Sequence, residues 1–337
     1  MRVLVGDIGG TNTRLAIADA APARPEIIAQ RTAPSAAFPS LAHAIDAFRA
    51  EPAARDAGAF DAICLGIAGP IEDGRCGATN LPWVVDTRSL GEHLRVDPAA
   101  IRLINDLEAA AFGVKTLGES DVVIFNAGAP SAAGNRAVVS AGTGLGEAGL
   151  FWDGSRHVAL ATEGGHADFA ARNQLEFDLL SYLNRRYGRV SYERVLSGPG
   201  LLNIYTFLRD TVRGPSESPD VRAALDAHPG KAHPITEAAV RNTCPLCAKT
   251  LELFLSIYGA EAGNVALTML ARGGVYLGGG IIGHLAPHVA AHPEHREVFL
   301  DAFTSKGRLS ALVEAIPVRA IVDPDVALRG AAVAAHA

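Results

Sequence analysis

Two stretches of the chain share one pattern, in which short apolar runs lie on both sides of a turn rich in glycine. They cover residues 3–18 and 137–151. In each, a β-branched apolar run leads into a turn of Gly and Thr, and a second apolar run follows. After the first turn, Leu15 and Ile17 alternate with alanines, which is the period of a strand. Both stretches are therefore predicted to be β-hairpins with glycine-rich tips.

A strand after the glycines changes the chemistry that they indicate. In a dinucleotide-binding fingerprint the glycines open a helix, and the pyrophosphate lies at that helix's N-terminus. A hairpin tip instead offers backbone N–H groups to an anion, with a hydroxyl from Thr11 or Thr143. Two such hairpins facing each other across a cleft would hold a polyphosphate from both sides. The alternative is a pair of tight turns that bind nothing.

Strands and helices alternate along the rest of the chain, which predicts an α/β fold with a largely parallel sheet. The predicted strands are 27–29, 62–68, 101–104 and one starting at 274. The predicted helices are 38–50, 107–113, 174–187, 198–212, 247–272, one starting after the glycines at 278–280, and 327–333. Residues 213–236 are polar and rich in Pro, Gly and His, which is typical of an irregular surface segment.

Length and charge narrow the class of protein. A chain of 337 residues favours two domains, and we expect one from residues 1–112 with 324–337 and the other from 113–323. The net charge of −6 argues against a nucleic-acid partner. No apolar run reaches membrane-spanning length, and the chain enters a strand at once, which leaves no room for a signal peptide. Four scattered cysteines favour a reducing cytoplasm.

Asn105 and Asp106 lie where a predicted strand gives way to a helix, a common place for a binding site in α/β folds. A purely structural role is the alternative. Asn105 with Glu108 fits a capping box, and Asp106 near the helix N-terminus complements the helix dipole. The two roles are compatible, because one residue can cap the helix while its neighbour contacts a ligand.

Three further side chains could bind a polyhydroxylated ligand. Glu163 and His166 lie three residues apart on a glycine-containing turn, and Glu193 precedes a glycine-rich helix start. Each could equally be a solvated surface residue.

Other patterns carry no prediction of a site. His284, His288 and His292 recur every four residues, but Pro287 and Pro293 are expected to interrupt the helix, and a solvated face is favoured over a metal site. Cys244 and Cys247 form a single C-x-x-C pair without a second pair at zinc spacing. The chain contains no Walker A pattern.

Six segments in order resemble motifs of the bacterial glucokinase family, within the actin-like, sugar kinase and Hsp70 ATPase superfamily. Residues 6–12 resemble its first phosphate motif, 140–146 its second, and 277–280 its adenosine motif. Residues 103–109, 163–169 and 193–200 resemble its sugar-site segments. The resemblance implies two actin-like (ribonuclease H-like) domains with a ligand cleft between them, and phosphorylation of the glucose 6-hydroxyl by ATP with Mg²⁺.

The resemblance also assigns roles to individual residues. It implies that Asp106 is the catalytic base and that glucose contacts are made by Asn105, Asp106, Glu163, His166 and Glu193. It implies that ATP is bound by Gly6, Asp7, Ile8, Gly9, Gly10, Thr11, Asn12, Gly142, Thr143, Gly144, Gly278, Gly279 and Gly280. Asp7 is a candidate for orienting the water shell of the metal, although a turn-forming Asp is the alternative.

The family also sets the alternatives. The chain lacks the clustered-cysteine zinc motif of the repressor/kinase relatives, and we expect no protein-bound metal of that kind. A kinase for another hexose or an amino sugar would keep every phosphate motif. A non-catalytic sugar sensor would need an output module, and no helix-turn-helix extension is present. Homodimers are usual in the family.

Overall fold

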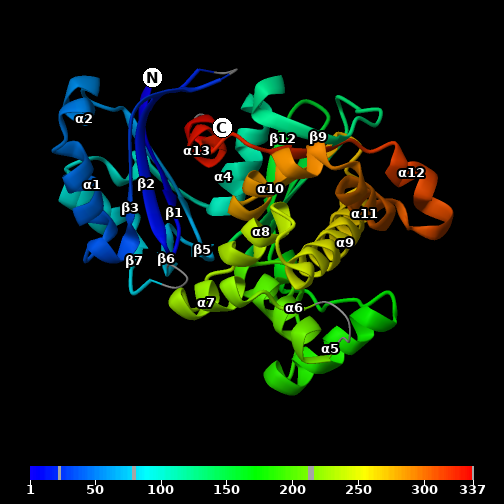
Figure 1. Cartoon of the computed structure of the whole chain (residues 1–337). Helices are drawn as coiled ribbons and strands as arrows, with labels where there is room; N and C mark the ends of the chain where they lie inside the picture. Colours follow the sequence, from blue (N-terminus) through cyan, green and yellow to red (C-terminus); the bar gives the residue numbers. More distant parts are fainter. Residues whose placement is uncertain (22–23, 78–80, 212–215, 336–337) are drawn as a thin grey trace. The chain divides into compact units, whose positions relative to one another are not determined.

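The computed structural model describes residues 1–21, 24–77, 81–211 and 216–335. Its residues form two compact units, each with its own sheet (Figure 1). The first unit comprises Met1–Asp121, Ala159–Ala161 and Asp323–Ala337, and the second comprises Val122–Val158 and Thr162–Val322. The predicted α/β architecture is confirmed, but the expectation of a largely parallel sheet is wrong, because each large sheet combines parallel with antiparallel strand pairs.

The first unit is built on a five-stranded sheet with the order β3-β2-β1-β4-β8. The strands are β1 (Arg2–Ile8), β2 (Asn12–Asp19), β3 (Glu26–Pro34), β4 (Ala62–Ile67) and β8 (Ile101–Asn105). β1 and β2 form the predicted antiparallel hairpin, while β4 runs parallel to both β1 and β8. A small second sheet contains β5 (Ile71–Glu72), β6 (Arg75–Gly77) and β7 (Val84–Asp86).

Alternate residues of the central strand β1 enter two different cores. Leu4 and Ile8 pack with α1 (Leu41–Arg49) and α3 (Thr87–Leu94). Val3 and Val5 pack on the other face with α4 (Asp106–Gly113) and α13 (Val326–Ala334). Because successive strand side chains point to opposite faces, this apolar run is the signature of a sheet covered on both sides. The unit also contains α2 (Pro52–Ala57) and the 3₁₀ turns η1 (Ser35–Ala37), η2 (Pro98–Ala100), η3 (Val114–Thr116) and η4 (Glu119–Asp121).

The C-terminal helix α13, red in Figure 1, packs directly against α4. A Cβ atom on Gly330 would lie 1.8 Å from the carbonyl oxygen of Ala109, and one on Gly113 would lie 2.1 Å from that of Val326. Two glycines therefore allow the two helix backbones to touch. This contact fixes the helix that begins at Asp106.

A six-stranded sheet with the order β12-β11-β10-β13-β14-β9 belongs to the second unit, apart from Ala159–Ala161 of β12, which are grouped with the first. The strands are β9 (Val122–Asn126), β10 (Arg136–Ala141), β11 (Leu145–Trp152), β12 (His157–Ala161), β13 (Gly274–Gly278) and β14 (Val318–Ile321). β10 and β11 form the second predicted hairpin, and β13 lies parallel to β10.

The second unit has its own core, centred on the long helix α9 (Pro245–Thr268). The sequence predicts one apolar stripe on this helix, but every residue from Ile257 to Gly263 is buried. The helix is covered on several sides because α6 (Gly198–Thr211), α8 (His233–Val240) and α11 (Pro293–Thr304) all pack against it. The helices are α5 (Gln174–Tyr187), α6 (Gly198–Thr211), α7 (Pro219–Ala227), α8 (His233–Val240), α10 (Gly280–Ala291), α11 (Pro293–Thr304) and α12 (Ser310–Glu314), with η5 (Gly164–His166), η6 (Tyr192–Arg194) and η7 (Gly307–Leu309).

The predicted segment 213–236 lies at the surface over most of its described part, as expected, but its backbone is not irregular. Residues 219–227 form α7, and α8 begins at 233. Ile235 is fully buried in the core of the second unit. The polar composition of the segment gave no indication of the short helix α8, whose apolar side chains pack against α9. Residues 213–215 of this segment lie outside the described part of the chain. The other residues outside it are 22–23, 78–80, 212 and 336–337.

The expected helix break at Pro287 is also wrong. Pro287 lies inside α10, whose neighbouring residues Leu285, Ala286 and Val289 are fully buried. Their packing compensates for the loss of the helical hydrogen bond that proline cannot donate. Pro293 begins the next helix, α11, at a position where a proline costs little.

The histidine run splits in two. His284 is exposed, whereas His288 and His292 are half-buried and stack with ring centroids 3.9 Å apart. His295 of α11 joins them, with its Nδ1 2.9 Å from Nε2 of His288. The prediction of a solvated face therefore holds for His284 alone.

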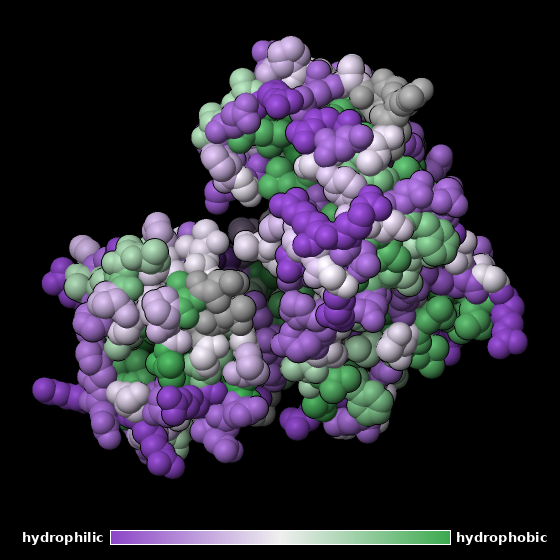
Figure 2. All heavy atoms as spheres, turned by 90° about the horizontal axis from the view of Figure 1, so that it is seen from below, coloured by the Kyte–Doolittle hydropathy of each residue, from purple (hydrophilic) through white to green (hydrophobic). Residues whose placement is uncertain are grey.

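Polar residues cover much of the face shown in Figure 2, and hydrophobic residues appear there as separate patches. No helix in the described ranges is long and apolar enough to cross a membrane.

Candidate functional site

The tip of the first hairpin is closed by its own backbone. The N–H of Gly9 donates to the carbonyl of Asn12 over 3.0 Å, and the Ser35 hydroxyl donates to the Gly9 carbonyl over 2.8 Å. Ser35 also contacts the Thr13 hydroxyl at 2.9 Å. Thr11 and Asn12 are exposed at the tip. Ser35 was not predicted, and it supports the tip from the start of η1, directly after β3.

Asn105 and Asp106 lie at the same edge of this sheet as the first hairpin tip. In the parallel registers, Ile8 pairs with Ile67 and Ile67 pairs with Asn105, so the three strands end together. The backbone of Asp106 lies beside Gly66, with its Cα 3.5 Å from the position of a Cβ there. The structure thus brings the predicted base and the first phosphate motif to one sheet edge.

Asn105 caps α4 as the sequence predicts. Its Oδ1 accepts a hydrogen bond from the Leu107 N–H over 2.9 Å, and its Nδ2 donates to the Gly69 carbonyl over 3.4 Å. The Asn105 N–H bonds the Glu108 carboxylate, which completes the capping box. Burial raises the pKa of the Glu108 carboxyl group, and Arg102 opposes this shift. The cap holds Asp106 in the first turn of the helix, where it is half-buried.

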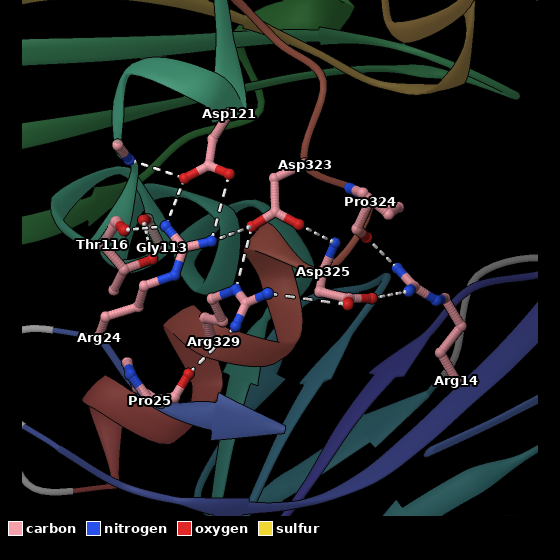
Figure 3. Close-up of polar contacts among 11 residues, drawn as sticks. Arg14, Arg24, Pro25, Gly113, Thr116, Asp121, Asp323, Pro324, Asp325 and Arg329 are labelled. Atoms are coloured by element: carbon pink, nitrogen blue, oxygen red, sulfur yellow. Dashed lines mark hydrogen bonds and ion pairs between the residues drawn. The ribbon is translucent and has the colours of Figure 1, made fainter. Parts of the chain in front are cut away.

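Asp7 is the charged residue of the first hairpin, and Arg14 lies opposite it in the β1–β2 register. Arg14 Nη1 is 3.9 Å from Asp7 Oδ2. Burial raises the pKa of the Asp7 carboxyl group, and the positive charge of Arg14 counteracts part of that shift. Arg14 also binds the Asp325 carboxylate and the Pro324 carbonyl just before α13 (Figure 3).

An ion-pair cluster continues from Asp325 (Figure 3). Arg329 Nε donates to Asp323 Oδ2 over 3.0 Å, and Arg24 binds both Asp121 and Asp323. Asp121 ends the first segment of this unit and Asp323 begins its last segment. The cluster therefore ties the ends of these two segments to the sheet that carries Asp7.

The second unit gathers the other two nucleotide motifs. β10 and β13 are parallel neighbours, and Ser140 pairs with Gly278 where both strands end. A Cβ on Gly279, whose φ is +87°, would lie 2.2 Å from the Ala141 carbonyl oxygen. Only a glycine fits this contact, which seats the start of α10 beside the tip that contains Gly142.

Glu193 reaches the same tip from η6. Its Oε2 accepts a hydrogen bond from the Leu145 N–H over 3.1 Å. A Cβ on Gly144 would lie 2.5 Å from that same oxygen. The predicted sugar contact Glu193 and the predicted nucleotide contact Gly144 are therefore direct neighbours. Nothing in the sequence pairs them, because they are distant along the chain.

Glu163 directly precedes η5 and His166 is its last residue, and both side chains are exposed. The loop is joined to η6 through the Tyr192 N–H, which donates to the Ala167 carbonyl over 2.9 Å. Arg189 adds a second link, because its Nη2 donates to the His166 carbonyl over 2.6 Å. Arg189 was not predicted, and its position before Glu193 is the only sequence signal for it. The predicted sugar contacts thus divide between the units, with Asn105 and Asp106 in the first and three acidic or histidine side chains in the second.

Comparison with known proteins identifies the family. The glucokinase family model matches residues 4–337. The glucokinase of Trichormus variabilis is 39% identical over 348 residues, covering 99% of this chain and 98% of its own. A glucokinase structure from an Antarctic psychrotroph has a TM-score of 0.80 at 31% identity, covering 99% of this chain and 98% of its own. A ROK-family glucokinase from Streptomyces griseus, solved with glucose and AMPPNP, shares the fold with a TM-score of 0.66 at 19% identity over 98% of both chains. The expected resemblance is confirmed, and the chain belongs to the glucokinase family.

Proposed function

We propose that this protein transfers the γ-phosphoryl group of ATP to the 6-hydroxyl of glucose. The observation that carries the proposal is the full-length match to glucokinases, combined with an aspartate at the edge of the sheet that holds a phosphate hairpin. The Streptomyces griseus relative with bound glucose and AMPPNP supports both substrates.

Asp106 acts as the general base. Its carboxylate accepts the proton of the sugar 6-hydroxyl, while the hydroxyl oxygen forms a bond to the γ-phosphorus and the bond to the β–γ bridging oxygen breaks, releasing ADP. Because the transition state of phosphoryl transfer is loose, the base mainly orients the hydroxyl and takes its proton late. The Asn105 cap and the α4–α13 contact keep Asp106 in place for this role.

Glucose is bound by Asn105 and Asp106 of the first unit together with Glu163, His166 and Glu193 of the second. ATP is bound by residues 6–12 and 142–144, with its adenosine at Gly278 to Gly280. Backbone N–H groups at both hairpin tips stabilise the phosphate charge. The two domains predicted from the sequence, 1–112 with 324–337 and 113–323, each contain candidate residues for both substrates.

The residues fit a magnesium ion carried by the nucleotide. Mg²⁺ typically binds one or two carboxylates together with substrate phosphates and waters, and Asp7 supplies one half-buried carboxylate at the first hairpin. Across the described residues, no group of three or more His, Cys, Asp or Glu could form an all-protein metal cage. When bound, the ion would neutralise charge on the phosphates.

The cellular setting follows from the same proposal. The four cysteines are free thiols and all are buried, which suits the cytoplasm, where ATP is also available. We further infer a homodimer, by analogy with the family.

A panel of hexoses tests the proposal. The purified protein is incubated with MgATP and glucose, mannose, fructose or glucosamine, and ADP release and the sugar phosphate are measured. We expect glucose to have the highest kcat/KM and the product to be the 6-phosphate. A different preferred sugar would identify a kinase for another hexose or an amino sugar. Binding of glucose without turnover would indicate a sensor.

A further inference from the structure

Two buried carboxyl groups lie together in the second unit. Glu147 of β11 is 5% exposed and Glu261 of α9 is 4% exposed. The two groups are close enough to share a hydrogen bond. Glu147 Oε1 is buried and has no other hydrogen-bond partner. Two charged carboxylates could not stay in contact there, so one proton must be retained between them.

The surrounding groups indicate which carboxyl keeps the proton. Glu261 Oε2 accepts a hydrogen bond from Asn264 Nδ2 over 2.9 Å, and the Tyr192 side chain also interacts with the Glu261 carboxyl group. Lys306 lies on the same side and donates to Asn264 Oδ1 over 2.7 Å. These partners favour a charged Glu261. Glu147 lacks them, and burial beside Glu261 raises its pKa to about 8.

Other charged or titratable groups near the pair are few. From α9, the hydroxyl of Tyr258 is near Glu147 but donates to the Val139 carbonyl over 2.7 Å. Arg172 acts on Lys306 and is itself paired with Glu176. Neither supplies a cation to Glu147.

The pair contacts both segments that carry the proposed glucose contacts in this unit, η5 and η6. A Cβ on Gly164, the first residue of η5, would lie 2.1 Å from Glu147 Oε2, so the carboxyl group is in contact with the loop backbone. Thr162, just before η5, donates its hydroxyl to the Glu147 carbonyl over 2.9 Å. On the other side, Tyr192 directly precedes Glu193 and contacts Glu261. The pair therefore touches η5 through Glu147 and η6 through Glu261.

We propose that Glu147 and Glu261 form a proton-sharing pair that positions the two glucose-binding loops, so that glucose affinity depends on the one proton they hold. The inference rests on the proposed function, because it takes Glu163, His166 and Glu193 as the glucose contacts of this unit. Loss of the proton would place two negative charges side by side in the core. The resulting repulsion pushes Glu147 against Gly164 and changes the Tyr192 contact. Neither carboxyl group touches substrate, and both are positioning residues.

The test uses Glu147→Gln in the full chain, because glutamine reproduces the neutral acid in shape but cannot lose a proton. The KM values for glucose and ATP are measured between pH 7.0 and 9.5 for wild type, Glu147→Gln and the control Glu297→Gln, which changes an exposed residue on α11. We expect the wild-type KM for glucose to rise roughly tenfold over this range, which corresponds to about 1.4 kcal/mol. The Glu147→Gln variant should keep the pH 7.0 value throughout, while the KM for ATP changes equally in all three proteins.

Each outcome decides the question. A wild-type KM for glucose that does not rise, or a Glu147→Gln variant that follows the wild-type profile, would overturn the inference while leaving glucose phosphorylation intact. A Glu147→Gln variant that fails to fold or to bind glucose at pH 7.0 would also overturn it, because a neutral Glu147 is then not what the site requires. Failure of the proposed function is distinct, since wild type would then phosphorylate no glucose at any pH.

Discussion

The carboxylate of Glu193 accepts a hydrogen bond from the backbone N–H of Leu145 over 3.1 Å, at the tip of the second hairpin. A proposed sugar contact and a proposed phosphate loop are thereby part of one local structure. From the sequence alone, one expects a substitution in the hairpin to affect the nucleotide and a substitution at Glu193 to affect the sugar. The hydrogen bond joins the two effects at this position.

Alanine at Gly144 and at Gly142 should therefore have different consequences. A Cβ on Gly144 would lie 2.5 Å from Glu193 Oε2, whereas one on Gly142 would meet no atom nearer than 4.0 Å. We expect Gly144→Ala to raise the KM for both glucose and ATP, and Gly142→Ala to raise the KM for ATP alone. Steady-state kinetics with each substrate varied in turn checks this, and equal patterns for the two variants would contradict it.

Replacing the proposed base should slow turnover without loss of fold. In Asp106→Asn the amide cannot accept the hydroxyl proton, and kcat should fall by roughly 10² or more while glucose still binds. The matched control is Asp56→Asn, an exposed aspartate of α2 in the same unit. Glucose binding is measured by calorimetry and turnover by ADP release. Near wild-type turnover in Asp106→Asn would remove this residue from the base role.

Substitution of the two glutamates of the proposed sugar site should have different effects on the KM for ATP. A carboxylate that holds a sugar hydroxyl loses a charge-assisted hydrogen bond when it becomes an amide. We expect Glu163→Gln and Glu193→Gln each to raise the KM for glucose at least tenfold, about 1.4 kcal/mol. Only Glu193→Gln should also raise the KM for ATP, since only that side chain hydrogen-bonds the hairpin tip. Wild-type glucose kinetics in both variants would place the sugar elsewhere.

Burial of Glu147 should make stability fall as the pH rises. The pKa of its carboxyl group is raised from 4.5 to about 8 in the folded protein. Between these values the unfolded chain has released a proton that the folded protein still holds, so the free energy of unfolding decreases with pH across this window. Glu147→Gln removes this dependence. Its free energy of unfolding, relative to wild type, should increase from pH 5 to pH 8 in urea titrations. A constant difference would show that Glu147 titrates normally.

The ion pairs of the cluster before α13 should contribute unequally to the stability of the first unit. The side chains of Asp323 and Arg329 are 5% and 15% exposed, whereas Arg24 is 42% exposed. Breaking a buried pair leaves a charge without its partner, so Arg329→Met should cost about 3 kcal/mol. Arg24→Met should cost less than about 1 kcal/mol. Urea unfolding measures both, and equal losses would contradict the role of burial. The double variant Arg329→Met with Asp323→Leu should recover part of the loss.

The sequence by itself determined the local elements of this protein. Alternation around Leu15 and Ile17 identified a hairpin, because successive strand side chains point to opposite faces of the sheet and the turn needs only adjacent residues. The Asn105 cap was predicted for the same reason, since donor and acceptor lie two residues apart. The family followed from six such segments in order.

Tertiary structure decided what depends on distant partners. Ile235 lies in a polar stretch and is buried only because α8 packs on α9. Glu147 has the sequence position of an ordinary strand residue, and its environment comes from Glu261, which α9 brings beside it. Glu193 meets Leu145 only when η6 folds against the hairpin. Burial, pKa and hydrogen bonding at these sites depend on the surrounding atoms, and residues far apart in the chain supply those atoms.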